Sequence, residues 1–174
     1  VREILMFTAQ LKYSDSTTVC AQRTSQMIDT LGLQKCAESC IGGPLLRGIS
    51  GGEKKRTAIG IELISNPTLV FLDEPTTGLD SKSAEKVVEL CREMKEEGRT
   101  VVSTIHQPNT YAYDLFDRMI VIGGTKIIFQ GTKEDCLDFF QANGHPVPAQ
   151  TNPCEHYMDV LSRPPVINEI KMKA

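Results

Sequence analysis

The sequence has no apolar run of the length that a membrane-spanning helix requires. Of its 174 residues 40% are hydrophobic, but apolar stretches such as Leu69–Leu72 and Met119–Ile122 are four residues long. A spanning helix takes about 20 predominantly apolar residues. We therefore expect that this polypeptide does not itself cross a membrane. Its apolar residues are enough for a core, and its length predicts one domain.

An excess of one charge sign is also missing, and cysteine is sparse. The 19 lysines and arginines nearly balance the 22 aspartates and glutamates, which excludes a dominantly basic nucleic-acid binder and an acidic disordered chain. Six cysteines are too few for a disulfide scaffold, and the closest pair, Cys36 and Cys40, lacks the second half of a zinc site. We interpret the cysteines as reduced, mostly buried thiols in a cytosolic setting.

The first third of the chain has the periodicity of helices. Apolar residues recur at helical spacing, and Gly32 is the expected stop of the second helix. The cluster Lys54–Arg56 is interpreted as a solvated helix face or an internal salt-bridge cluster rather than a nucleic-acid patch. The predicted helices are Arg2–Lys12, Cys20–Leu31 and Ser50–Ser65.

The remainder alternates strands and helices, which predicts an α/β layer. Thr68–Leu72 is typical of a strand buried on both faces of a parallel sheet, and Thr100–Ile105 is a second such strand. The amphipathic helix Ser81–Glu97 connects them, and Gly98 is expected to end it. Further predicted elements are a hairpin and two helices: Arg118–Ile122 with Lys126–Gln130, then Thr132–Asn143 and Glu155–Leu161.

An acidic pair, Asp73 and Glu74, follows the first predicted strand. Open α/β sheets bind ligands at the carboxyl ends of their strands. Adjacent carboxylates there are costly unless a cation or a reaction needs them, because like charges repel. The first carboxylate suits a water-coordinated Mg²⁺ and the second suits polarising an attacking water. The alternative is structural: the pair ends a strand and caps a turn.

A serine and two glycines, Ser50, Gly51 and Gly52, begin the third predicted helix. Such a start exposes several backbone N–H groups, and the helix dipole adds partial positive charge. This arrangement suits a phosphate, with the Ser50 hydroxyl as a further donor. The alternative is a plain serine N-cap with glycines for turning.

Two further features accompany these. Gly78–Asp80 follows the acidic pair, and His106 ends the strand that begins at Thr100. A lone histidine at a strand end is usually structural. If the two strands are parallel and adjacent, however, His106 lies at the same sheet edge as Glu74.

In this order and spacing, the four features resemble the nucleotide-binding domain of an ABC transporter. The segment Ile49–Glu53 matches the signature motif, and Leu69–Glu74 matches Walker B with its catalytic glutamate. Gly78–Asp80 resembles the D-loop, and His106 resembles the switch histidine. The surrounding sequence is similar to subfamily G, which includes exporters of sterols, pigment precursors and xenobiotics.

The resemblance implies an α/β fold of the P-loop NTPase (RecA-like) type, with a parallel sheet core and a helical subdomain. Residues 1–66 would be the helical subdomain with the signature motif, 67–145 the C-terminal part of the ATPase core, and 146–174 a linker towards a membrane domain. The P-loop is missing, because no Gly-Lys dipeptide occurs. By family order we expect the P-loop before Val1 and the membrane domain after Ala174.

The resemblance also implies a site shared by two nucleotide-binding domains that meet head to tail and sandwich ATP. Asp73 would hold Mg²⁺ through water, and Glu74 would activate the attacking water. His106 would contact the γ-phosphate, and Asp80 would tie the two sites together. The signature residues would bind the ATP held by the partner domain: Ser50, Gly51, Gly52 and Glu53.

These roles imply ATPase activity that powers export of a lipid, sterol, pigment precursor or xenobiotic. The whole protein would be integral to a membrane, with this domain on the cytosolic face and no nucleic-acid partner. Two alternatives are a soluble ABC-type ATPase of translation or DNA repair and an inactive fragment. Without a P-loop, we expect the chain alone to bind ATP weakly or not at all, and to aggregate through an exposed apolar sheet edge.

Overall fold

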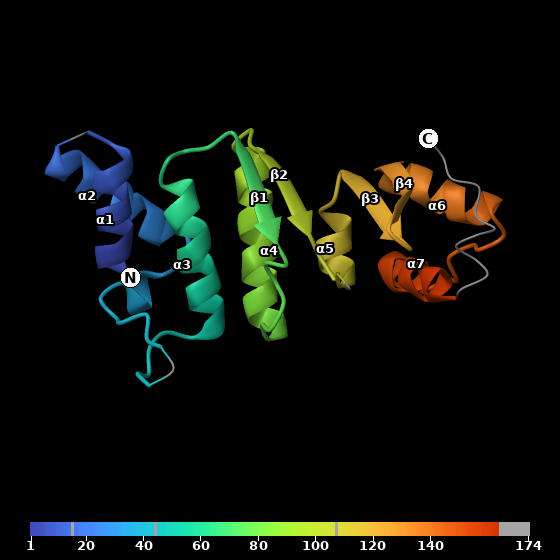
Figure 1. Cartoon of the computed structure of the whole chain (residues 1–174), viewed down its shortest axis with the longest axis horizontal. Helices are drawn as coiled ribbons and strands as arrows, with labels where there is room; N and C mark the ends of the chain where they lie inside the picture. Colours follow the sequence, from blue (N-terminus) through green and yellow to red (C-terminus); the bar gives the residue numbers. More distant parts are fainter. Residues whose placement is uncertain (15, 44, 107, 164–174) are drawn as a thin grey trace. The chain divides into compact units, whose positions relative to one another are not determined.

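A computed structural model describes residues 1–163 of the chain except 15, 44 and 107 (Figure 1). The chain divides into two compact units, Val1–Ile105 and His106–Ala174. We describe each unit by itself. The subdomain boundaries expected after residues 66 and 145 stay predictions.

The first unit begins with helices, as predicted. They are α1 (Arg2–Lys12), α2 (Thr17–Thr30) and α3 (Gly51–Leu63), with a 3₁₀ turn, η1 (Gln34–Cys36), after α2. The three α-helices approach closely at Gly60, where a Cβ would lie 2.4 Å from Leu31 Cδ1 and 3.3 Å from Leu5 Cδ2. Glycine therefore allows this packing. The helical core is built from buried residues on all three helices, among them Leu5, Ala9, Cys20, Ile28, Ile59 and Leu63.

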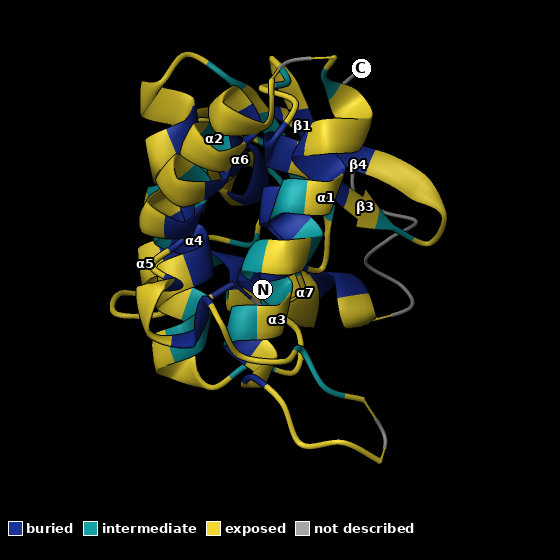
Figure 2. Cartoon of the chain, turned by 90° about the vertical axis from the view of Figure 1, so that its left-hand side faces the viewer, coloured by how far each residue is buried: buried dark blue, intermediate teal, exposed yellow. Residues whose placement is uncertain are grey.

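The predicted strand–helix–strand unit follows. Strand β1 (Leu69–Asp73) pairs in parallel with β2 (Thr100–Thr104), and α4 (Ser81–Glu96) connects them. Leu69 lies opposite Thr100 and Asp73 lies opposite Thr104, so both strands end at the same edge. Helix α4 is amphipathic, with its buried residues along one side (Figure 2). That side joins Val70 in the core of the first unit through Val87, Leu90 and Met94.

One face of this sheet is exposed, which corrects the expectation that its strands are buried on both faces. Phe71 is 71% exposed, and its neighbours Leu69 and Val102 are 47% and 43% exposed. These side chains alternate with Val70, which is 5% exposed and faces the core. Within the described part of the first unit, the sheet is thus packed against helix on one face and open on the other.

The second unit holds the predicted hairpin and helices. Strands β3 (Arg118–Gly123) and β4 (Lys126–Thr132) pair antiparallel, and α6 (Lys133–Ala142) and α7 (Pro153–Ser162) follow. Its core is aromatic: the rings of Phe140 and Tyr157 stack at 4.2 Å between centroids. The short helix α5 (Thr110–Asp114) was not predicted, because five residues carry no readable periodicity.

The helix ends at Gly32 and Gly98 and the burial of the cysteines agree with what the sequence predicted. Gly32 and Gly98 end their helices at φ +61° and +84°, backbone angles that favour glycine. Among the free cysteines four are buried, as expected for thiols used in packing: Cys20, Cys36, Cys136 and Cys154. In the described part of the chain, no helix has the length and apolar character needed to cross a bilayer.

Candidate functional site

The acidic pair lies at the edge where β1 and β2 end. Asp73 is the last residue of β1, and the Thr104 hydroxyl donates a 2.6 Å hydrogen bond to its Oδ1. The Glu74 N–H in turn donates to the Thr104 carbonyl at 3.1 Å and to its Oγ1 at 2.9 Å. Both carboxylate residues are exposed. Thr104 therefore orients the pair while leaving carboxylate oxygen available to a ligand.

The backbone of Glu74 adopts a conformation that is unusual for a side-chain-bearing residue. Its φ is +44°, in the left-handed region, which costs on the order of 1 kcal/mol or more for residues other than glycine. Hydrogen bonds to both the N–H and the carbonyl of Glu74 hold this conformation. Besides the bonds to Thr104, the Glu74 carbonyl accepts from the Lys55 ammonium at 3.1 Å and from the Thr77 N–H at 3.3 Å. Helix α3 is thereby tied directly to the acidic turn through Lys55.

The start of α3 is a complete capping box. The Ser50 N–H donates to Glu53 Oε2 at 2.8 Å, and the Glu53 N–H donates to Ser50 Oγ at 3.3 Å. These bonds to Ser50 hold the pKa of Glu53 below its usual value, so its carboxylate is ionised at neutral pH. An α-helix leaves four N-terminal N–H groups without helical partners. The box uses two of them, and those of Gly51 and Gly52 remain for another acceptor.

The two signature glycines differ in their surroundings. Gly52 is buried against the first turn of α4, where a Cβ would lie 2.7 Å from both Cβ and Oγ of Ser83. Gly51 is exposed, and a Cβ there would meet Leu79 Cδ2 at an ordinary 3.7 Å. Packing of α3 on α4 thus requires glycine at 52 but not at 51.

Asp80 begins α4 in the same neighbourhood. Its Oδ1 accepts the Ser83 N–H at 3.0 Å, and bonding to Ser83 lowers the pKa of Asp80. Asp80 therefore acts as the N-cap of α4. The turn before it, with Gly78 at φ +76°, leads from the acidic pair to the helix that packs on Gly52.

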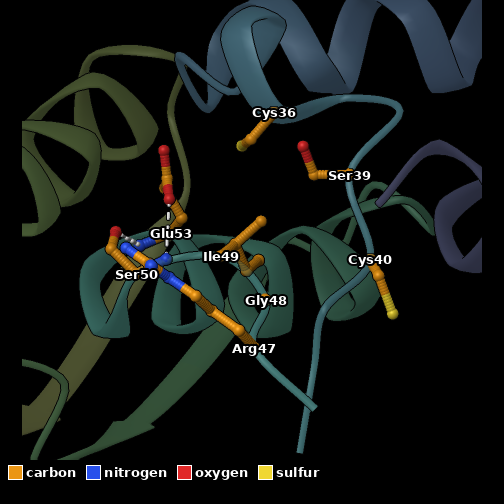
Figure 3. A pocket seen from close by; sticks show the side chains of 8 residues that line it. All are labelled: Cys36, Ser39, Cys40, Arg47, Gly48, Ile49, Ser50 and Glu53. Atoms are coloured by element: carbon orange, nitrogen blue, oxygen red, sulfur yellow. Dashed lines mark hydrogen bonds between the residues drawn. The ribbon is translucent and has the colours of Figure 1, made fainter.

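A pocket of about 530 Å³ opens beside the capping box (Figure 3). In Figure 3 the thiol of Cys36 points towards Glu53, whereas that of Cys40 points away. Burial and the neighbouring Glu53 carboxylate raise the pKa of Cys36, which favours the neutral thiol over the thiolate. The pocket lining comes from η1, the following loop and the start of α3: Cys36, Ser39, Cys40, Arg47, Gly48, Ile49, Ser50 and Glu53.

The basic cluster at the start of α3 is not a uniformly solvated face. Lys54 is exposed, as predicted, but Arg56 is 5% exposed, and its Nε donates to the Leu31 carbonyl at 2.9 Å. The prediction of a solvated face is therefore wrong for Arg56. The reason is that Leu31 caps the C-terminus of α2, where a cation stabilises unpaired carbonyls.

His106 follows β2 and opens the second unit. His106 is exposed. Because β1 and β2 are parallel and end at the same edge, Glu74 follows the end of β1 and His106 comes two residues after the end of β2. The placement of the imidazole beside Glu74 stays a prediction.

Asp73 has the chemistry of a magnesium ligand that works with a bound nucleotide. Among the described residues, no group of three or more His, Cys, Asp or Glu side chains could hold a metal. Mg²⁺ in nucleotide sites takes one or two carboxylates, several waters and the substrate phosphates. A single exposed carboxylate whose geometry is fixed by Thr104 fits that use.

Comparison with known sequences places the chain in a family. The family model described as ABC transporter matches residues 2–77, and the one described as ABC-2 type transporter matches residues 106–171. ABC transporter G family member 11 of Arabidopsis thaliana is 42% identical over 164 residues, which cover 93% of this chain and 23% of that protein. The broad substrate specificity ATP-binding cassette transporter ABCG2 of Mus musculus is 42% identical over 166 residues, 93% of this chain and 25% of that protein. The chain belongs to the ABC transporter family, subfamily G.

Membership confirms the resemblance drawn from the signature, Walker B, D-loop and switch sequences. A more distant member, ABC transporter G family member 1 of Dictyostelium discoideum, is 39% identical over 166 residues, 93% of the chain and 21% of that protein. The chain thus spans about a quarter of the length of the curated relatives it matches. The mixed α/β fold with a small parallel sheet agrees with the ATPase domain of this family.

Proposed function

We propose that this chain is part of the ATP-binding and ATP-hydrolysing domain of a subfamily G transporter. The observation that carries the proposal is the anchored acidic turn. Thr104 and Lys55 fix Asp73 and Glu74 at the carboxyl edge of the parallel strands, with Glu74 in a strained conformation. Strain of this kind concentrates at functional sites.

The acidic pair divides the work of phosphoryl transfer. Asp73 would hold Mg²⁺ through water, and the ion would supply positive charge to the phosphates of ATP. Glu74 orients the attacking water and accepts its proton. Because Thr104 bonds to the Asp73 carboxylate and to the Glu74 backbone N–H, it fixes that carboxylate relative to the Glu74 backbone and is a positioning residue.

The signature residues act on the second ATP of a two-domain sandwich. The N–H groups of Gly51 and Gly52 and the Ser50 hydroxyl hydrogen are the donors offered to a γ-phosphate held by the partner domain. Glu53 supports them by completing the capping box. Asp80 links the two sites across the interface, and His106 contacts the γ-phosphate.

The remaining proposal concerns the whole transporter. ATP binding brings two nucleotide-binding domains of the same or different chains together on the cytosolic face, and hydrolysis separates them. The cycle powers export of a lipid, sterol, pigment precursor or xenobiotic through a membrane domain of the same polypeptide. The subfamily G relatives support this over a soluble ATPase of translation or DNA repair, since they are named as transporters.

Glu74→Gln in the complete transporter tests the proposal. The amide keeps the shape of the side chain but is no longer a base, so we expect ATP turnover to fall by about 10²-fold or more while ATP binding persists. Glu85→Gln, an exposed change on α4, is the matched control with unchanged turnover. Normal hydrolysis by Glu74→Gln would show that the assignment is wrong.

A further inference from the structure

The short helix after the switch histidine is held at both ends by side chains from later in the chain. The Pro108 carbonyl, just before α5, accepts from Asn152 Nδ2 at 2.7 Å. The Asp114 carbonyl, at the end of α5, accepts from the Lys133 ammonium at 2.7 Å. A helix of this length is unstable alone. External bonds therefore decide where α5 and the Pro108 backbone before it lie.

The Asn152 amide makes two bonds at once. Its Oδ1 accepts the Cys154 N–H at 3.0 Å and so caps α7, while its Nδ2 reaches Pro108, 44 residues away in sequence. Pro108 is buried, so its carbonyl needs a protein partner. One side chain thus joins the start of α7 to the backbone at Pro108.

Helix α7, which carries this link, is packed into the core of the second unit. Tyr157 and Val160 are 1% and 2% exposed, and Tyr157 stacks on Phe140 of α6. Pro153 at the first helical position favours a helix start at this point. A displacement of α7 therefore moves Asn152 and, through it, the Pro108 carbonyl.

We propose that Asn152 is a positioning residue that couples the switch segment, defined here as His106 and the backbone of Pro108, to helix α7. The inference rests on the proposed role of His106 and adds the group that sets its position. The ABC-2 type transporter model matches 106–171, a single span that contains both partners of this bond. The bond makes the switch segment and α7 move together during the ATP cycle.

Two substitutions of Asn152 separate coupling from helix capping. Asn152→Asp and Asn152→Ser both supply an oxygen that caps α7, but neither donates to the Pro108 carbonyl at the same reach. Of the two substitutions, Asn152→Ser keeps the cap and removes the donor without adding a charge. Thr132→Ala removes the N-cap of α6 in the same unit and serves as the control for capping loss alone.

The experiment is steady-state ATP hydrolysis by the complete transporter. Loss of one hydrogen bond predicts that Asn152→Asp and Asn152→Ser lower kcat about three- to tenfold with KM for ATP within about twofold. Thr132→Ala should leave kcat unchanged. In a His106→Ala background, the Asn152 substitutions should have no further effect, because they act through His106.

The outcomes are distinguishable. If His106→Ala itself leaves kcat unchanged, the proposed role of His106 is wrong and the coupling has nothing to act on. If His106→Ala lowers kcat but the Asn152 variants do not, the coupling is wrong and the proposed function stands. Equal losses from Asn152→Ser in both backgrounds would also overturn it, since Asn152 would then act independently of His106.

Hydrogen exchange in the same proteins gives a readout besides activity. The Tyr113 N–H bonds to the Asn109 carbonyl in the first turn of α5. Releasing Pro108 should speed exchange at Tyr113 several-fold in Asn152→Ser but not in Thr132→Ala. Unchanged exchange at Tyr113 would show that Asn152 does not hold α5.

Discussion

Single residues determine how the acidic turn is built. Asp73 and Glu74 are adjacent, yet they depend on one hydroxyl from the neighbouring strand, which donates to the first and accepts from the backbone of the second. Thr104 was not singled out from the sequence. Its signal was the parallel register, which places the last residue of β2 opposite Asp73.

Thr104→Val tests this dependence, because valine keeps the shape and removes the hydroxyl. We expect a loss of about 1–2 kcal/mol in the free energy of unfolding of the chain. In the complete transporter, ATP hydrolysis should fall several-fold because Asp73 and Glu74 lose their common anchor. Thr100→Val, at the other end of β2, is the matched control. Equal activity of the two variants would contradict the role of Thr104.

The signature glycines give a second comparison. Gly52→Ala should lower the free energy of unfolding by about 1–3 kcal/mol, since its Cβ would collide with Ser83. Gly51→Ala meets an ordinary contact and should be neutral or slightly stabilising by up to about 1 kcal/mol. Thermal unfolding of the two variants at low protein concentration measures the difference. The reverse order would mean that α3 and α4 do not pack as described.

Elements were predictable where periodicity and end signals agreed. The hairpin, the parallel strand pair and helix α4 have strong patterns, and glycines such as Gly98 mark the helix ends. Helix α5 is too short to show a pattern, and its position depends on Asn152 and Lys133, far away in sequence. Burial was harder to predict. An apolar strand is expected to be buried on both faces, but its sequence does not tell whether residues of this same chain pack on each face. Phe71, on the exposed face of β1, is the example.

The site was predictable in the same uneven way. The residue types and their order located the acidic pair at a strand end and Ser50 at a helix start, and the structure confirms both positions. The left-handed backbone of Glu74 and the burial of Arg56 arise from tertiary contacts that no local pattern records.

The exposed sheet face predicts how the chain behaves when isolated. Phe71→Ser should reduce aggregation and binding of an apolar dye, because Phe71 is the most exposed apolar side chain of β1. Its effect on the free energy of unfolding should be small. Val70→Ser, one residue away on the buried face, should instead cost about 2 kcal/mol or more. Light scattering and urea unfolding distinguish the two, and similar destabilisation by both would contradict the assigned faces.

At the scale of the whole molecule, the chain combines the signature helix, the Walker B strand and the switch segment without a P-loop. In P-loop NTPases that loop cradles the β- and γ-phosphates. Under the proposed function, the groups this chain offers would serve two different nucleotides: the Asp73 carboxylate would hold the metal of its own site, and the two N–H groups at the start of α3 would bind the ATP held by the partner domain. We infer that the chain contributes these parts of a shared site and depends on other sequence for the rest.

Titration calorimetry of the chain with Mg²⁺ and ATP tests this dependence. Without a phosphate-binding loop, we predict no saturable heat at ATP concentrations up to about millimolar, the weak range expected for a few exposed contacts. Saturable binding with micromolar affinity and one ATP per chain would contradict the account, because the chain would then hold a complete nucleotide site of its own.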